Sequence, residues 1–274
     1  MISLLYAGNE KVFDGILIST LSAARHASRP LSVTLLTMDL SDQDKAFTPI
    51  TEKQRAFLER TLRREDPQNT VTLLDIGDLY REKLLRSPNA ETSYSPYCFL
   101  RLFADKLDLP DKVLYLDADT VVCGDLAELY DTDLSGYEYG AVLDYYGKIF
   151  MGWHYFNSGV MLLNLPEIRK TGLLAAAADL CARKRLFLPD QTALYRCTKR
   201  KKLLPRRFNE QKKYDRPDTV IQHFTKTILW LPYFHTRTIK PWQPDEVKKT
   251  LTRRYDALLD EYLDLKRSFE EENR

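Results

Sequence analysis

The sequence is poor in glycine, and this excludes several common kinds of site. Only 10 of its 274 residues are glycine, and it contains no G-x-G-x-x-G, G-x-x-x-x-G-K-[ST] or G-x-S-x-G pattern. Glycine-rich phosphate loops and the nucleophile elbow of the hydrolases are therefore excluded. A phosphate-binding protein without such a loop must neutralise phosphate charge with a metal ion or with side-chain cations.

Cysteine and net charge are also low. The four cysteines (Cys98, Cys123, Cys181 and Cys197) form no close pair, which excludes a disulfide scaffold and a zinc knuckle and predicts reduced thiols in the cytoplasm. Lys and Arg number 41 and Asp and Glu 39, so the net charge is +2 and we expect no nucleic-acid partner. The N-terminus shows neither the basic segment nor the cleavage site of a signal peptide.

Two segments raise the question of membrane contact. Ile149–Pro166 has no Asp, Glu, Lys or Arg, but its glycines and asparagines predict a buried loop and strand rather than a membrane helix. Arg196–Lys213 contains nine Lys or Arg and one Glu. We predict a solvated loop there, and the alternative is peripheral contact with an anionic membrane at its inner face.

Short apolar segments alternate with amphipathic ones, which predicts an α/β fold with a mostly parallel central sheet flanked by helices. The last segment, Asp245–Arg274, reads as one amphipathic helix, so we divide the chain into residues 1–244 and a helical extension, residues 245–274. We predict that this helix packs on the body, and the alternative is that it lies at a membrane interface. The predicted strands are Ile2–Ala7, Leu31–Thr37, Thr70–Ile76, Val113–Leu116, Gly140–Leu143, Gly159–Leu165 and Thr219–His223, and the predicted helices begin at Phe13, Thr51, Pro96 and Leu173.

Asp117 and Asp119 directly follow the apolar strand Val113–Leu116. Side chains at i and i+2 of an extended backbone point to the same side, so the two carboxylates converge where ligands of α/β sheets bind. Such a pair favours a hard divalent cation, Mg²⁺ or Mn²⁺. The alternative is a polar turn with both carboxylates in water.

Other polar residues stand at the ends of predicted strands or at the start of a helix. Each has an ordinary structural alternative: a turn, a helix cap for Asp190, a core histidine or a surface lysine. Taken together, acids, amides, an imidazole and a cation suit a sugar-phosphate site. These residues are Asp144, Asn157, Ser158, Asp190, Gln191, His223 and Lys240.

In this order along the chain, the motifs resemble glycosyltransferase family 8, whose members are retaining, nucleotide-sugar-dependent enzymes of the GT-A fold, a Rossmann-like fold. The family includes bacterial lipopolysaccharide galactosyl- and glucosyltransferases. The resemblance runs from about Leu4 to Trp242. It rests on Arg101-Leu102, Asp111–Asp119, Phe156–Val160, Leu163–Leu165, Asp190-Gln191, His223-Phe224 and Lys240–Trp242.

The resemblance implies a role for each matching residue. Asp117, Asp119 and His223 would bind Mn²⁺ (or Mg²⁺) against the diphosphate of a UDP-sugar, with Lys240 as a further diphosphate ligand. Gln191 would lie nearest the anomeric carbon, and Asp190 and Asp144 would act on the sugar beside it. The remaining donor contacts would be Ala7 and Asn9 at the uridine, and Arg101, Ala118, Asn157 and Ser158.

The sequence departs from the family pattern in two places. Lys11-Val12 stand where the family often has Asn-Tyr. Lys226 replaces a glycine, and Thr227–Ile239 lengthen the link to Lys240. That insertion contains His235, a second candidate for the metal ligand, although His223 directly follows a predicted strand.

The predicted function is transfer of a hexose, glucose or galactose, from a UDP-sugar to a glycan or glycolipid acceptor with retention of configuration. The alternative is a non-catalytic UDP-sugar-binding protein on the same fold. Retention is compatible with a protein nucleophile or with front-face attack, and the weak basicity of the Gln191 amide favours front-face attack.

Overall fold

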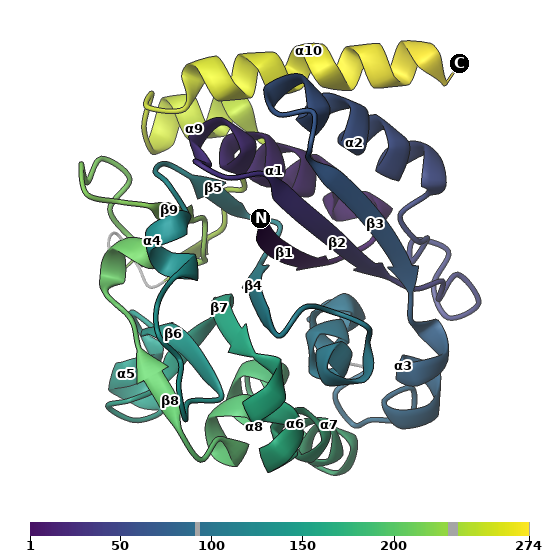
Figure 1. Ribbon diagram of the computed structural model, residues 1–274, viewed down its shortest axis with the longest axis vertical. Coiled ribbons are helices and arrows are strands. Elements are labelled where there is room, and N and C mark those ends of the chain that lie inside the picture. The colour runs from purple at the N-terminus through teal and green to yellow at the C-terminus, as the bar shows by residue number, and fades with distance from the viewer. Residues whose placement is uncertain (91–93, 230–234, 274) are drawn as a thin grey trace.

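A seven-stranded sheet forms the centre of the protein (Figure 1). The computed structural model describes residues 1–90, 94–229 and 235–273. The strand order is β3-β2-β1-β4-β7-β6-β8, and in this described sheet β7 alone runs against the others. The predicted mostly parallel sheet is confirmed. Its strands are β1 (Ile2–Ala7), β2 (Leu31–Thr37), β3 (Thr70–Asp75), β4 (Lys112–Leu116), β6 (Tyr139–Leu143), β7 (Phe156–Asn164) and β8 (Lys201–Leu203).

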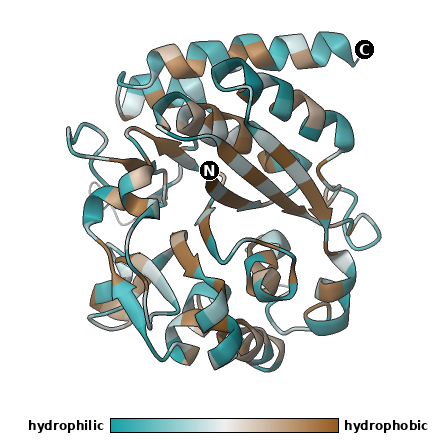
Figure 2. Cartoon of the chain, in the orientation of Figure 1, coloured by the Kyte–Doolittle hydropathy of each residue, from teal (hydrophilic) through white to brown (hydrophobic). Residues whose placement is uncertain are grey.

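Helices cover both faces of the sheet, because successive apolar residues of each strand point to opposite sides. On β1, Leu4 joins the core cluster under α1 and α2, whereas Leu5 joins the cluster on the other face. Figure 2 shows these central strands as the most hydrophobic part of the chain. One face carries α1 (Phe13–His26), α2 (Glu52–Glu65) and α10 (Asp256–Glu272), and the other carries α3 (Gly77–Lys83), η2 (Pro96–Lys106), α6 (Leu165–Thr171), α7 (Leu173–Arg183) and α8 (Pro189–Cys197).

Shorter elements connect this frame. A two-stranded sheet pairs β5 (Thr120–Val122) with β9 (Ile221–His223), and a hairpin pairs β10 (Thr227–Leu229) with β11 (His235–Arg237). The remaining short helices are η1 (Glu10–Val12), α4 (Ala127–Tyr130), α5 (Gly147–Phe150), η3 (Arg206–Phe208) and α9 (Pro244–Thr250). None of the described helices is long and apolar enough to cross a bilayer.

Three local predictions need correction. The segment predicted as a helix from Pro96 is a 3-10 helix, and this tighter turn brings Arg101 Nε within 3.0 Å of the Cys98 carbonyl. Asp190 is not the N-cap of its helix, because Leu188 occupies that position with a φ of 48°. The basic segment Arg196–Lys213 is not simply a loop, since β8 within it pairs with β6 as the edge of the sheet.

The C-terminal segment forms two helices rather than the single predicted one. Between α9 and α10, the Thr252 hydroxyl donates to Asp215 at 2.6 Å and accepts from the backbone N–H of Arg254, and such side-chain bonds compete with helical ones. The predicted packing on the body is confirmed, because Phe269 of α10 contacts Phe57 of α2 with ring centroids 4.9 Å apart. The division of the chain at residue 244 stays a prediction.

Candidate active site

The two acids after β4 converge, as their spacing predicts. Asp117 is fixed from several sides: its backbone N–H donates to the Gly159 carbonyl at 2.8 Å, and its Oδ1 accepts from Arg101 Nη2 and from the Tyr115 hydroxyl, both at 2.8 Å. Its second oxygen, Oδ2, lies 3.9 Å from His223 Nε2. One carboxylate oxygen of Asp117 is therefore held by the protein and the other faces the site.

The pairing of two short strands places His223 beside the acids. In the antiparallel pairing of β5 with β9, Thr120 lies opposite His223, which sets the imidazole beside Asp119. The Nε2 atom lies 3.1 Å from Asp119 Oδ1, and Nδ1 lies 3.1 Å from Asn209 Oδ1. A contact between residues more than a hundred positions apart thus completes the cluster.

Asn209 is a candidate functional residue that the sequence did not reveal. It is fully buried, and its Nδ2 donates to Asn157 Oδ1 at 2.9 Å, so its own oxygen is the atom that faces His223. Nδ1 of the imidazole therefore donates to Asn209, and Nε2 is the ring atom that faces the two carboxylates. If a metal bound at Nε2, a partner of this kind would orient the ring and raise the affinity of the histidine for the metal.

The cluster suits a divalent cation in its donor chemistry and its space. Ligand atoms of Asp117, Asp119 and His223 all lie within 4.8 Å of one another. Gly159 lines the same space: a Cβ there would lie 2.1 Å from His223 Cε1 and 2.7 Å from Asp117 Oδ2. Two carboxylates and an imidazole fit Mn²⁺ or Mg²⁺. The side chain of the rival ligand His235 lies outside the described part of the structure.

Lys240 adds a cation to the same cluster. Its Nζ contacts Asp119 Oδ2 and donates to the Phe224 carbonyl at 3.2 Å. Burial by itself raises the pKa of Asp119, but the charges of Lys240 and His223 outweigh it and hold that pKa well below its ordinary value. Asp119 is thus a carboxylate at neutral pH.

A second group of side chains surrounds Asp144, at the carboxyl end of β6. Its Oδ1 accepts from the backbone N–H groups of Tyr146 at 3.1 Å and Gly147 at 2.6 Å. Its Oδ2 accepts from Asn157 Nδ2 at 3.1 Å and from Gln191 Nε2 at 3.3 Å. Four donors therefore fix the orientation of the Asp144 side chain.

Gln191 and Asp190 sit at the start of α8, and both meet Ser158. The Gln191 Oε1 atom accepts from Ser158 N at 2.9 Å, and Asp190 Oδ2 accepts from Ser158 Oγ at 3.3 Å. Arg101 is only 5% exposed and joins the two groups, because its Nε lies 3.4 Å from Asp190 Oδ2 while its Nη2 binds Asp117. Burial raises the pKa of Asp190, and Arg101 opposes that rise.

The predicted uridine contacts lie at the neighbouring strand end. Leu5 of β1 pairs with Tyr115 of β4, so Ala7, two residues on, ends its strand level with Asp117. Asn9 is buried, and its Nδ2 donates to the Ala46 carbonyl at 3.3 Å. Ala118 lies between the two acids. The structure places the predicted residues near the carboxyl ends of the parallel strands. Their roles in binding a donor stay predictions.

Comparison with known proteins identifies the family. The sequence profile of glycosyl transferase family 8 matches residues 3–246. The chain belongs to glycosyltransferase family 8.

Several glycosyltransferases resemble this chain over part of their length. A lipopolysaccharide 1,2-glucosyltransferase of Escherichia coli is 32% identical over 190 residues, covering 52% of this chain and 54% of the relative. Glycosyltransferase GlyF of Streptococcus pneumoniae is 35% identical over 99 residues, or 35% of this chain. The matched segments span only 24% of GlyF and 12% of glycosyltransferase GlyA from the same organism.

Solved structures share the fold. The galactosyltransferase LgtC, in complex with donor and acceptor sugar analogues, superposes with a TM-score of 0.63 at 19% identity, covering 97% of this chain and 96% of LgtC. GlyE of Streptococcus pneumoniae gives a TM-score of 0.62 at 21% identity, covering 99% of this chain and 63% of GlyE. This family 8 chain therefore has the expected GT-A fold.

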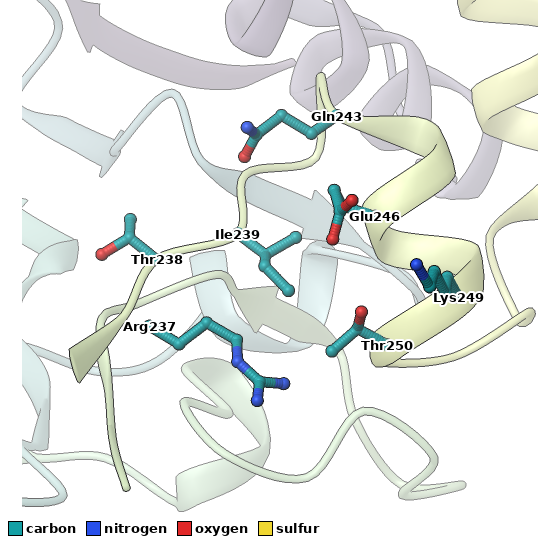
Figure 3. A pocket seen from close by; sticks show the side chains of 7 residues that line it. All are labelled: Arg237, Thr238, Ile239, Gln243, Glu246, Lys249 and Thr250. Carbon is teal, nitrogen blue, oxygen red and sulfur yellow. The ribbon is translucent and has the colours of Figure 1, made fainter. Parts of the chain in front are cut away.

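An open cavity of this family 8 protein lies beside the site rather than in it. Its volume is about 730 Å³, and it lies between the segment from Arg237 to Gln243 and helix α9 (Figure 3). The cavity is lined by Arg237, Thr238, Ile239, Gln243, Glu246, Lys249 and Thr250, of which Glu246, Lys249 and Thr250 belong to α9. Lys240 follows Ile239, so the cavity borders the cation of the site but contains none of its acids.

Proposed function

We propose that this family 8 glycosyltransferase moves glucose or galactose from a UDP-sugar to a glycan or glycolipid acceptor, with retention of configuration and with Mn²⁺ or Mg²⁺. The proposal rests on two sets of side chains that lie together near the carboxyl ends of the parallel strands. Asp117, Asp119 and His223 suit a cation and a diphosphate. Asp144, Asn157 and Gln191 form a polar group, joined to them through Asn209, that suits a hexose.

The diphosphate end is built to accept the charge of a leaving nucleotide. Departure of UDP builds negative charge on the leaving oxygen and oxocarbenium character on the sugar. Asp117, Asp119 and His223 would hold a divalent ion, which would supply Lewis-acid stabilisation of that diphosphate. The ammonium of Lys240 lies against Asp119, where it would add a second positive charge.

The sugar end supports front-face attack rather than a covalent intermediate. Both ends of the Gln191 amide are engaged, its oxygen by Ser158 N and its nitrogen by Asp144, and an amide oxygen is weakly basic. Asp144 accepts four hydrogen bonds, which lowers its nucleophilicity. Asp190 is buried and bound by Arg101 and Ser158. These residues orient the sugar, and the leaving phosphate accepts the acceptor's proton.

The test is a donor screen. UDP-glucose, UDP-galactose and other UDP-sugars are incubated with Mn²⁺, with and without mixed glycan acceptors, and released UDP and the product anomer are measured. We expect turnover of one UDP-hexose with an α-linked product from the α-linked donor. Binding of a UDP-sugar without turnover would instead indicate the non-catalytic protein. A covalent glycosyl adduct trapped at Asp144 or Asp190 would refute front-face attack.

A further inference from the structure

An unusually apolar surface lies on α5 and the turn that follows it. Ile149 is 68% exposed, Phe150 69% and Trp153 89%. Three of the seven exposed large hydrophobic residues in the described chain thus fall within five consecutive positions. Isolated exposed hydrophobic residues are ordinary, whereas a contiguous group marks a contact surface. We call Ile149, Phe150 and Trp153 the apolar patch.

Cations gather beside the apolar patch around the ring of Tyr145. Lys212 Nζ lies 4.5 Å from the ring centroid, and Lys148 Nζ and Arg206 Cζ each lie 5.6 Å from it. Two acids are near these bases in the sequence: Glu210 is fully buried and binds Arg206, and Asp144 accepts four hydrogen bonds at the proposed sugar site. No Asp or Glu occurs between Tyr145 and Pro166. The surface around the patch therefore presents positive charge to a partner.

The same segment begins and ends at the proposed sugar site. Asp144 accepts the first N–H groups of α5 from Tyr146 and Gly147, and its own N–H donates to the Tyr155 carbonyl at 3.0 Å. Asn157, two residues further, binds the same carboxylate. A partner that covers the apolar patch therefore lies next to the proposed sugar site.

We propose that the apolar patch and its cations form a docking surface for an anionic lipid bilayer. Isoleucine, phenylalanine and tryptophan are the side chains that enter the boundary between head groups and acyl chains, and lysine and arginine pair with anionic head groups. Ile149 and Phe150 offer no polar atom to a sugar, so a lipid surface fits this set better than a glycan. Docking here brings a lipid-linked acceptor to Asp144, and that last step rests on the proposed function.

Vesicle co-sedimentation tests the docking without any turnover. The probe is a vesicle of about one-third phosphatidylglycerol in phosphatidylcholine, compared with pure phosphatidylcholine. The intact protein is expected to bind the anionic vesicles and to bind the neutral ones at least about tenfold more weakly. Ile149→Ser with Phe150→Ser is expected to weaken anionic binding by about tenfold or more.

Matched controls come from the opposite end of the molecule, where α10 and α2 lie (Figure 1). Leu263 of α10 is 37% exposed, and Leu263→Ser is expected to leave vesicle binding unchanged. Lys148→Glu with Lys212→Glu is expected to abolish most binding, whereas Lys53→Glu with Arg64→Glu on α2 removes the same charge and has little effect. Circular dichroism on every variant shows that the fold is kept.

Trp153 supplies a direct optical signal. Brominated lipid in the vesicles is expected to quench the fluorescence of the intact protein and to quench Trp153→Phe clearly less. Equal vesicle binding by the patch variants and their controls would overturn the proposal. So would binding of a water-soluble glycan that depends on Trp153 when vesicles do not bind. UDP-sugar hydrolysis in the absence of lipid is measured in parallel, and its failure would count against the proposed function alone.

Discussion

Replacing Asn209 by leucine tests the metal site through a residue that is not a ligand. Asn209→Leu keeps the branched shape of the side chain but removes the acceptor of His223 Nδ1, 3.1 Å away, and the donor to Asn157, 2.9 Å away. The imidazole is then free to move its proton to Nε2, which takes that lone pair away from the metal. Loss of such an outer-shell partner lowers metal affinity by about 10- to 100-fold, or about 1.4–2.8 kcal/mol.

The assay is titration of Mn²⁺ followed by electron paramagnetic resonance of the free ion, so no turnover is needed. Asn69→Leu is the matched control, because Asn69 is also buried and bonds to Leu31 N and the Leu62 carbonyl at the amino ends of β2 and β3. Both variants should lose stability, since each leaves buried polar groups unpaired. Only Asn209→Leu should lose affinity for Mn²⁺.

Asn209→Asp separates positioning from packing. It keeps an oxygen for His223 Nδ1 and is expected to recover most of the Mn²⁺ affinity that leucine removes, although it loses the donor to Asn157. Unchanged Mn²⁺ affinity in folded Asn209→Leu would refute the reasoning. Equal losses in Asn209→Leu and Asn69→Leu would refute it as well, because a general loss of stability would then explain both.

Three further predictions concern the site and the core. Asp119→Asn should abolish Mn²⁺-dependent release of UDP while circular dichroism stays native; near-normal release would show that Asp119 is not a ligand. Gly159→Ala places a Cβ 2.1 Å from His223 Cε1, so calorimetry should detect little Mn²⁺ binding, and wild-type binding would contradict the predicted crowding. Burial raises the pKa of Glu138, but hydrogen bonds from Thr198 and from two backbone N–H groups outweigh it and lower that pKa below the ordinary 4.5. The ionised group therefore stabilises the fold above pH 4.5, and this stability is lost as the pH falls through the lowered pKa. The difference in melting temperature between the wild type and Glu138→Gln should accordingly shrink below that pH, and a constant difference would show that Glu138 does not titrate as described.

The strands and the acid pair could be predicted because their signals are local. Val113–Leu116 is an unbroken apolar segment, and the i, i+2 spacing of Asp117 and Asp119 acts within one strand end. His223 was placed by its strand and by the family resemblance. The contact that completes the site depends on the pairing of β5 with β9, which no local pattern specifies.

Asn209 could not be found in the same way. It follows the 3-10 helix η3 within a basic segment, and nothing in its neighbours distinguishes a buried asparagine from a surface one. Lys201–Leu203 likewise lack the alternation of a strand, and β8 forms because β6 offers it an open edge. The sequence did not predict the break before α10, because the apolar period continues across it. At the break, the Thr252 hydroxyl bonds to Asp215, outside the helix.

The buried amides of Asn157 and Asn209 link His223 to Asp144 by a chain of hydrogen bonds in which each donor points toward Asp144. The carboxylate of Asp144 can only accept, so Asn157 must turn its nitrogen toward it and its oxygen away. That oxygen faces the nitrogen of Asn209, whose own oxygen is left for His223. The position of Asp144 thereby decides, three hydrogen bonds away, which nitrogen of the imidazole meets Asn209 and which faces Asp117 and Asp119. One acid sets the orientation of a ring that it never touches.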